Sequence, residues 1–157
     1  MAIVKTNFYT QSLNQFRPER LRGELLDWGL NACVLDVVID ASETGTLYAG
    51  DLVKVCPTST GKLKVVAGES TDRAVGYIIF NAKKESFKAG DHCSILLRGG
   101  VIECITEEAL DAGDIVAYKD ADGSVTATIG AGVQRMGMAM EATTATEGGV
   151  RVPVLVC

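Results

Sequence analysis

Ala49-Gly50-Asp51-Leu52-Val53 is the stretch that decides the fold, because the chain uses its first three residues three times. They return as Ala89-Gly90-Asp91 and again in Ala112-Gly113-Asp114-Ile115-Val116. Glycine adopts backbone angles that are costly for other residues, and an aspartate side chain accepts hydrogen bonds from its own turn. The apolar residues that follow then start a strand. We therefore predict structural turns, and not an acidic catalytic site, at Gly50, Asp51, Gly90, Asp91, Gly113 and Asp114.

Two of these turns open a longer repeat, with one unit over about 49–98 and another over about 112–156. The offset between matching glycines is 63 at Gly50/Gly113, 62 at Gly61/Gly123 and 61 at Gly76/Gly137. That drift needs only two single-residue deletions, and we interpret the pattern as an internal β duplication. Gly76 and Gly137 each lie inside an apolar strand, where glycine indicates a bulge or the close approach of another backbone.

Short strands rich in valine and isoleucine fill the chain from Ala32 onward. The expected strands are 32–39, 51–56, 62–67, 73–80, 92–98, 101–105, 114–119, 124–129, 134–141 and 150–156. Their spacing favours a mainly antiparallel β-barrel or sandwich over a parallel α/β sheet. Asp122-Gly123 and Arg98-Gly99-Gly100-Val101 are hairpin signals. A single helical turn is expected at 106–110, where Thr106 would cap it.

The composition limits the classes of function. The chain has 157 residues, 47% of them hydrophobic, which suits one domain with a sizeable core. No run approaches the roughly 18 apolar residues of a membrane helix, and no secretion signal is evident. A net charge of -5 argues against nonspecific nucleic-acid binding. Five cysteines without a CxxC pair indicate reduced thiols, mostly buried: Cys33, Cys56, Cys93, Cys104 and Cys157.

Residues 1–31 differ from the β domain at 32–157 and are predicted to form an extended N-terminal arm. Pro18 could open a short helix that places Leu21, Leu25 and Trp28 on one face, although Gly23 weakens it. Exposed aromatics on an arm usually have a partner that covers them, and aromatics and arginines concentrate binding energy. The alternative is that they pack back onto their own domain. The predicted partner contacts are Phe8, Tyr9, Phe16, Arg17, Arg20, Arg22 and Trp28.

The usual catalytic patterns are missing from the sequence. GxSxG, Walker and HExxH motifs do not occur, and His92 is followed by Cys93 in a strand, where alternation puts them on opposite faces. Asp120-Ala121-Asp122-Gly123 fails the register of a calcium loop. We expect no catalytic residue, no metal site and no cofactor.

The second repeat carries a resemblance. Ala112-Gly113-Asp114-Ile115-Val116-Ala117-Tyr118, Gly123-Ser124-Val125-Thr126, Met136-Gly137-Met138-Ala139 and Val150-Arg151-Val152-Pro153-Val154-Leu155-Val156 follow one another in order. This plan resembles the capsid cement, or head decoration, proteins of tailed bacteriophages over roughly residues 45–157. The resemblance implies a noncatalytic protein on the outer surface of an expanded head, made in the host bacterial cytoplasm. It implies a homotrimer that binds the major capsid protein, with no nucleic-acid or membrane partner.

Two other functions remain open at this point. One is a β-barrel recognition module for carbohydrate, although the only tryptophan lies in the arm. The other is a small trimeric enzyme whose site is shared between subunits.

Overall fold

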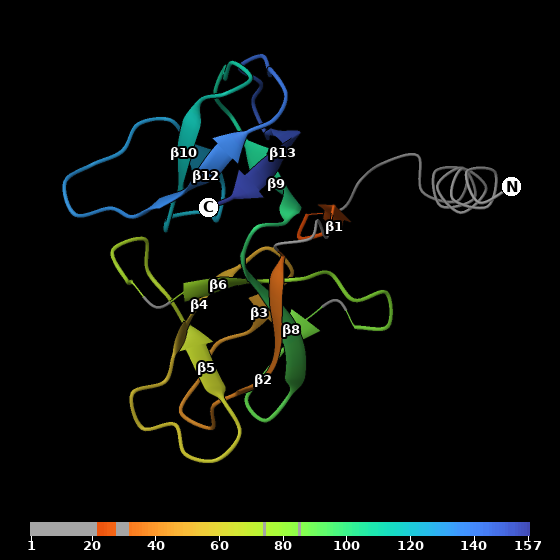
Figure 1. Cartoon of the computed structure of the whole chain (residues 1–157), viewed down its shortest axis with the longest axis vertical. Coiled ribbons are helices and arrows are strands. Elements are labelled where there is room, and N and C mark those ends of the chain that lie inside the picture. Colours follow the sequence, from red (N-terminus) through yellow and green to blue (C-terminus); the bar gives the residue numbers. More distant parts are fainter. Residues whose placement is uncertain (1–21, 28–31, 74, 85) are drawn as a thin grey trace, which may run out of the picture.

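The computed structural model describes residues 22–27, 32–73, 75–84 and 86–157. Within these residues the chain forms thirteen strands and no helix. The all-β class predicted from strand spacing is therefore confirmed. Figure 1 shows two β units, one above the other, with the first unit below and the second above.

The first unit is a closed barrel of five strands in the order β2-β5-β4-β6-β8. Its strands are β2 (Cys33–Ile39), β4 (Leu52–Val55), β5 (Lys64–Ala67), β6 (Val75–Ile78) and β8 (His92–Arg98). β2 closes the barrel by pairing antiparallel with β8 and parallel with β5. A small sheet of β3 (Leu47–Tyr48) and β7 (Ser86–Phe87) contributes Leu47 and Phe87 to the barrel core.

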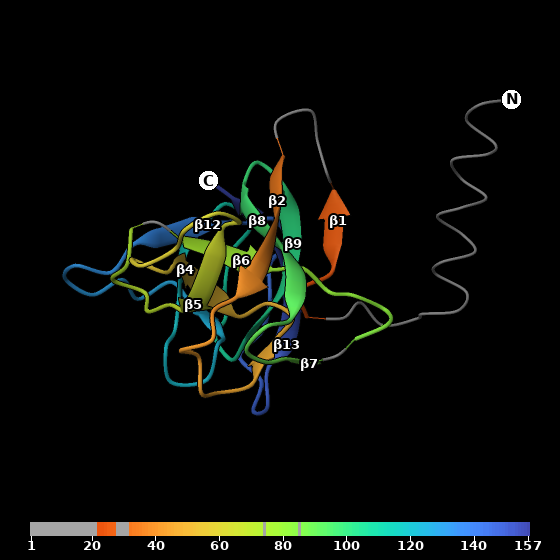
Figure 2. The ribbon, with the colours of Figure 1, turned by 90° about the horizontal axis from the view of Figure 1, so that it is seen from below.

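The second unit is a six-stranded sheet in the order β1-β9-β13-β12-β10-β11. Its strands are β1 (Leu25–Asp27), β9 (Val101–Thr106), β10 (Ile115–Tyr118), β11 (Val125–Thr126), β12 (Arg135–Ala139) and β13 (Val150–Val156). All its pairings are antiparallel. Figure 2 shows β1 beside β9 at one edge of this sheet.

The two units have the same strand order once β1 is set aside. The order β5-β4-β6-β8-β2 in the first corresponds to β11-β10-β12-β13-β9 in the second. The registers match as well: Leu52 pairs with Tyr77 and Tyr77 with Leu96, as Ile115 pairs with Met138 and Met138 with Leu155. This correspondence supports the predicted duplication and extends it one strand earlier, to β2 and β9. We call residues 33–98 the first unit and residues 101–156 the second unit.

The three Gly-Asp turns have one hydrogen-bonding pattern. Each aspartate carboxylate accepts from the backbone N–H three residues earlier, at 2.8 Å from Tyr48, 2.7 Å from Lys88 and 2.8 Å from Asp111. Each preceding glycine has a positive φ, of 87°, 86° and 101°. Because that angle strains any residue with a Cβ, the Gly-Asp pair sets the direction in which the next strand begins.

Gly76 and Gly137 both lie where another chain segment approaches closely. A Cβ at Gly76 would stand 2.8 Å from the Cδ1 atom of Ile95, a side-chain tip. A Cβ at Gly137 would collide with the backbone carbonyl oxygen of Leu155. The predicted close approach of another backbone is therefore present at Gly137, whereas at Gly76 the close neighbours are side chains.

The larger core lies between the units. The face of the first unit that points away from its own barrel interior contributes Leu52, Tyr77, Ile79 and Leu96. These side chains pack with the interior of the second unit, which contributes Ile102, Cys104, Leu110, Val116, Val125, Met136, Ala139, Val152, Val154 and Val156. Apolar burial of this kind is the main favourable term in folding, so the two units depend on each other for stability.

Three local predictions were wrong. A helix was expected from Pro18 to Trp28. Over residues 22–27, the part of it that the structure describes, the chain instead forms a turn at Gly23 and the strand β1. Gly23 has a φ of 78° and lies against the Ala49–Gly50 backbone, which is incompatible with a helix. Arg98-Gly99-Gly100-Val101 is not a hairpin: β8 and β9 belong to different sheets, and the Gly99 N–H donates to the Val156 carbonyl.

The third is the helical turn at 106–110. There β9 continues to Thr106 and Leu110 enters the core. The Thr106 hydroxyl does accept from the Glu108 N–H at 3.1 Å, but this bond closes a local turn and caps no helix. Thr143 from a distant loop then accepts from the Leu110 N–H, which fixes the segment without a helix.

Candidate functional site

Most of the predicted partner contacts lie outside the described residues. These are Phe8, Tyr9, Phe16, Arg17, Arg20 and Trp28. Arg22 is the exception, and its side chain is only 22% exposed.

Arg22 links the two units from within the chain. Its Nη1 atom donates to the Asp51 carboxylate at 2.9 Å and to the Ala49 carbonyl at 3.2 Å, both in the first unit. Its Nη2 atom donates to the Gly123 carbonyl at 3.0 Å, in the second unit. A guanidinium is suited to this because its fork of donors has a fixed geometry. The side chain is thus occupied inside the molecule, which differs from the partner contact predicted for it.

The backbone next to Arg22 is tied down in the same way. The Gly23 N–H donates to the Glu103 carbonyl at 2.8 Å, and the Phe80 N–H donates to the Gly23 carbonyl at 2.8 Å. The Glu103 N–H donates to the Glu24 carbonyl at 2.9 Å. Residues 22–27 therefore belong to the folded body, although the arm was predicted to reach residue 31.

Tyr118 marks where the two units meet. Its ring lies 6.3 Å from the ring of Tyr77, centroid to centroid. Burial, and next the Asp51 carboxylate, raise the pKa of the Tyr118 phenol above its usual range. The hydroxyl therefore stays neutral at this junction.

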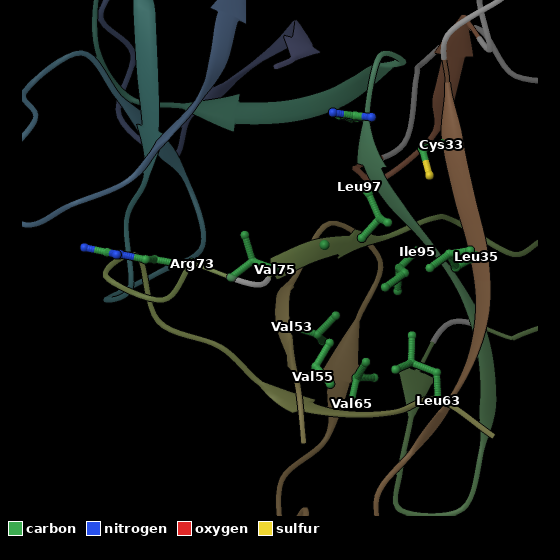
Figure 3. A pocket seen from close by; sticks show the side chains of 12 residues that line it. Cys33, Leu35, Val53, Val55, Leu63, Val65, Arg73, Val75, Ile95 and Leu97 are labelled. Carbon is green, nitrogen blue, oxygen red and sulfur yellow. The ribbon is translucent and has the colours of Figure 1, made fainter. Parts of the chain in front are cut away.

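An apolar opening with a volume of about 370 Å³ lies at the mouth of the first barrel. Figure 3 shows the lining side chains converging on it, and most of them come from β2, β4, β5, β6 and β8. Its lining is aliphatic apart from Cys33 and two arginines, Arg73 and Arg98, and consists further of Leu35, Val53, Val55, Leu63, Val65, Val75, Gly76, Ile95 and Leu97. Leu47 and Phe87 pack into the same barrel core away from this opening, since neither is among its lining residues.

The chemistry of the mouth is that of an apolar contact surface. Leu35 and Val55 are each 38% exposed there, which is uncommon for large aliphatic side chains unless a partner covers them. No aromatic side chain is among the described lining residues. Stacking on a sugar ring needs such a side chain, so the mouth does not favour the carbohydrate-binding alternative.

The chemistry-bearing residues elsewhere are dispersed. His92 is exposed and its Nδ1 atom lies 3.0 Å from the Lys62 ammonium, while Cys93 points into the barrel core. Burial raises the pKa of the Cys93 thiol to about 11 and that of Cys104 to about 12, so both stay protonated. Among the described residues no group of three or more His, Cys, Asp or Glu side chains is placed to hold a metal ion.

All five cysteines are free, in line with the prediction of reduced thiols, and Cys157 is the exposed one. In the part of the chain that the structure describes, no helix is long and apolar enough to cross a membrane.

Comparison with known proteins gives a likeness of fold. No protein-family model and no curated protein matches the sequence. Among solved structures, the chain is similar to the N base of head fiber gp8.5 in bacteriophage phi29, with a TM-score of 0.53 and 13% sequence identity. The match covers 80% of this chain and 95% of the fiber base. The two proteins share a fold.

Proposed function

We propose that this chain is a noncatalytic structural protein of a tailed bacteriophage, bound as a homotrimer to the outer surface of the expanded head. Its partner is the major capsid protein, and its place is in the virion after synthesis in the host cytoplasm. The observation that carries the proposal is the fold shared with a phage head fiber base over 95% of that base. The ordered sequence motifs that resemble head decoration proteins support it independently.

The arm supplies the capsid contacts in this proposal. Phe8, Tyr9, Phe16 and Trp28 provide apolar anchors, and Arg17 and Arg20 pair with carboxylates on the capsid. Arg22 is left out because its guanidinium is engaged with Asp51 and Gly123. Weak contacts repeated over three copies then add up to tight attachment through high effective concentration.

Cosedimentation with phage heads that lack the protein tests this function. The full chain is expected to bind expanded heads saturably and unexpanded heads at least tenfold more weakly. A chain that starts at Arg22 and also carries Trp28→Ala keeps β1 and the Arg22 contacts but lacks every proposed anchor, so it is expected to fold and yet to lose binding. Circular dichroism of the shortened chain checks that it is folded. Binding of the full chain to neither form of the head, or equal binding of both chains, would contradict the proposal.

A further inference from the structure

The barrel mouth of the first unit has a counterpart in the second unit that is already filled. Ile102 corresponds to Leu35 in strand order and register, and Val156 corresponds to Leu97. Ile102 is 0% exposed and Val156 is 2% exposed, whereas Leu35 is 38% exposed and Leu97 is half-buried. Equivalent positions are thus buried in one unit and open in the other.

The side chains that fill the second unit's mouth come from the first unit. Leu52, Tyr77, Ile79 and Leu96 point away from their own barrel and pack into the core of the second unit. We call these four residues the first outer face. The contact of Tyr77 with Tyr118 lies within this packing.

The second unit carries the same face in the same register. Ile115, Met138, Met140 and Leu155 correspond to Leu52, Tyr77, Ile79 and Leu96, and all four are apolar. We call them the second outer face. Ile115 is 40% exposed and Met140 is 43% exposed. Among the described residues, four of the five large exposed hydrophobic side chains lie either on this face or in the first mouth.

One contact of this kind is therefore made inside the chain, and the same two kinds of surface recur elsewhere on the described residues, where nothing covers them. A mouth is open on the first unit and an outer face is open on the second. Two surfaces that differ from each other form a head-to-tail interface, which closes into a ring when the rotation allows and otherwise extends.

We propose that the second outer face of one copy covers the barrel mouth of the next copy, so that each trimer is a ring of six β units. This contact between face and mouth would be the interface of the proposed trimer. The inference takes only the number of copies, three, from the proposed function and does not depend on capsid binding. Arg73 and Arg98 lie at the rim of the mouth, and the aliphatic lining between them receives the apolar face.

The contact inside the chain predicts which residues meet between copies. Tyr118 packs against the core cluster that contains Leu52. Ile115 corresponds to Leu52, and Val55 corresponds to Tyr118 on the matching strand. Val55 of one copy should therefore lie against Ile115 of another.

A pair of charge variants tests the head-to-tail arrangement in the full-length chain. Val55→Glu disrupts the mouth and Ile115→Glu disrupts the face, and each is expected to weaken association about a hundredfold or more, because each buries an unpaired charge. Both positions are more than a third exposed, so the chains should still fold. Analytical ultracentrifugation gives the mass, and thermal unfolding checks the fold.

Mixing the two variants is the decisive step. The Val55→Glu chain keeps a working face and the Ile115→Glu chain keeps a working mouth, so one contact forms. The remaining mouth and the remaining face each carry a glutamate and repel each other, so a 1:1 dimer appears that cannot grow. Two-fold interfaces, in which each copy presents the same patch, would give no such dimer. A wild-type chain that stays monomeric up to high micromolar concentration, as when residues 1–21 cover the mouth themselves, would overturn the proposal. The proposal would also be overturned if either charge variant, on its own, had the same oligomeric mass as the wild-type chain. Head binding by a monomer would overturn this interface while leaving the capsid proposal standing.

Discussion

The two β units share a strand order and a register, yet they have different surroundings. The interior of the second unit is covered by the first outer face. The interior of the first unit holds Leu47 and Phe87 away from the mouth and is open at the mouth. A duplicated unit therefore does not fix which of its surfaces is buried; that depends on what lies next to it in the chain.

The Gly-Asp turns, by contrast, are alike in both units. All three Gly-Asp turns have a glycine of positive φ and the same aspartate hydrogen bond, whether they belong to one unit or the other. Local bonding is set by two adjacent residues and is insensitive to the wider environment. Burial is set by packing over long sequence separations, and there the two units diverge.

Truncating a side chain at matched positions of the two units should give the largest difference in stability between them. Ile102→Ala removes a side chain that is 0% exposed, and we expect it to lower the free energy of unfolding by about 3–4 kcal/mol. Leu35→Ala, at the matching position in the open mouth, should cost about 1 kcal/mol or less in the monomer, because water already reaches that side chain. Urea denaturation measures both. Equal losses would mean that the mouth is as well packed as the second unit.

The paired glycines give the next largest difference. Gly137→Ala places a methyl group against the Leu155 carbonyl, and backbone cannot move aside cheaply, so we expect a loss of about 3 kcal/mol. Gly76→Ala meets the tip of Ile95, which can rotate into the open mouth, so its loss should be about 1 kcal/mol. Thermal unfolding of both variants under the same conditions measures which of them loses more stability. The reverse order would contradict the close backbone approach at Gly137.

Arg22 offers a way to loosen the contact between the units. Arg22→Ala should lower stability by about 2 kcal/mol, because it leaves Asp51 without its charged donor and removes the bond to Gly123. Arg22→Lys should recover little of this, since one ammonium replaces a fork that reaches both units. Lys119→Ala is the matched control: that lysine pairs with Asp122 on the surface, where such pairs contribute little. A control that costs as much as Arg22→Ala would refute the link.

The smallest effect concerns pH and the turn at Asp91, which has a lysine partner. A side-chain bond from Lys84, and then the Lys88 N–H, hold the pKa of Asp91 below its ordinary value of 3.8. A depressed pKa adds stability above the unfolded-state pKa, and that stability is lost as the pH falls through the folded-state value. The wild-type urea midpoint should thus fall between about pH 5 and pH 2, and Asp91→Asn should reduce that fall. An unchanged pH profile in the variant would exclude this contribution.

Much of the fold could be predicted because its signals are local. The ten strands expected from apolar runs all occur, with ends that shift by a few residues. Gly-Asp turns and the hairpin at Asp122-Gly123 depend on backbone angles that neighbouring residues determine. The strands that were missed, β1, β3 and β7, are two or three residues long and are held by distant partners.

The remaining misses come from long-range contacts. Arg98-Gly99-Gly100-Val101 has the composition of a hairpin, but the chain crosses there from the first unit to the second. Arg22 was grouped with the other arginines of the predicted arm, because no neighbouring residue in the sequence indicates that Asp51 and Gly123 are its partners. The open mouth was also beyond sequence reasoning, since Leu35 and Ile102 are both aliphatic residues in alternating strands.

One measurement tests most directly the claim that the first mouth is completed by another copy. Val55→Cys and Ile115→Cys are placed in separate chains that also carry Cys33→Ser and Cys157→Ser, which remove the two native thiols that are not buried. The chains are mixed and treated with a short thiol-specific cross-linker. The account predicts a covalent dimer with one chain of each kind, and no cross-linked product from either chain alone. Absence of the mixed dimer, or equal yields from the single chains, would contradict it.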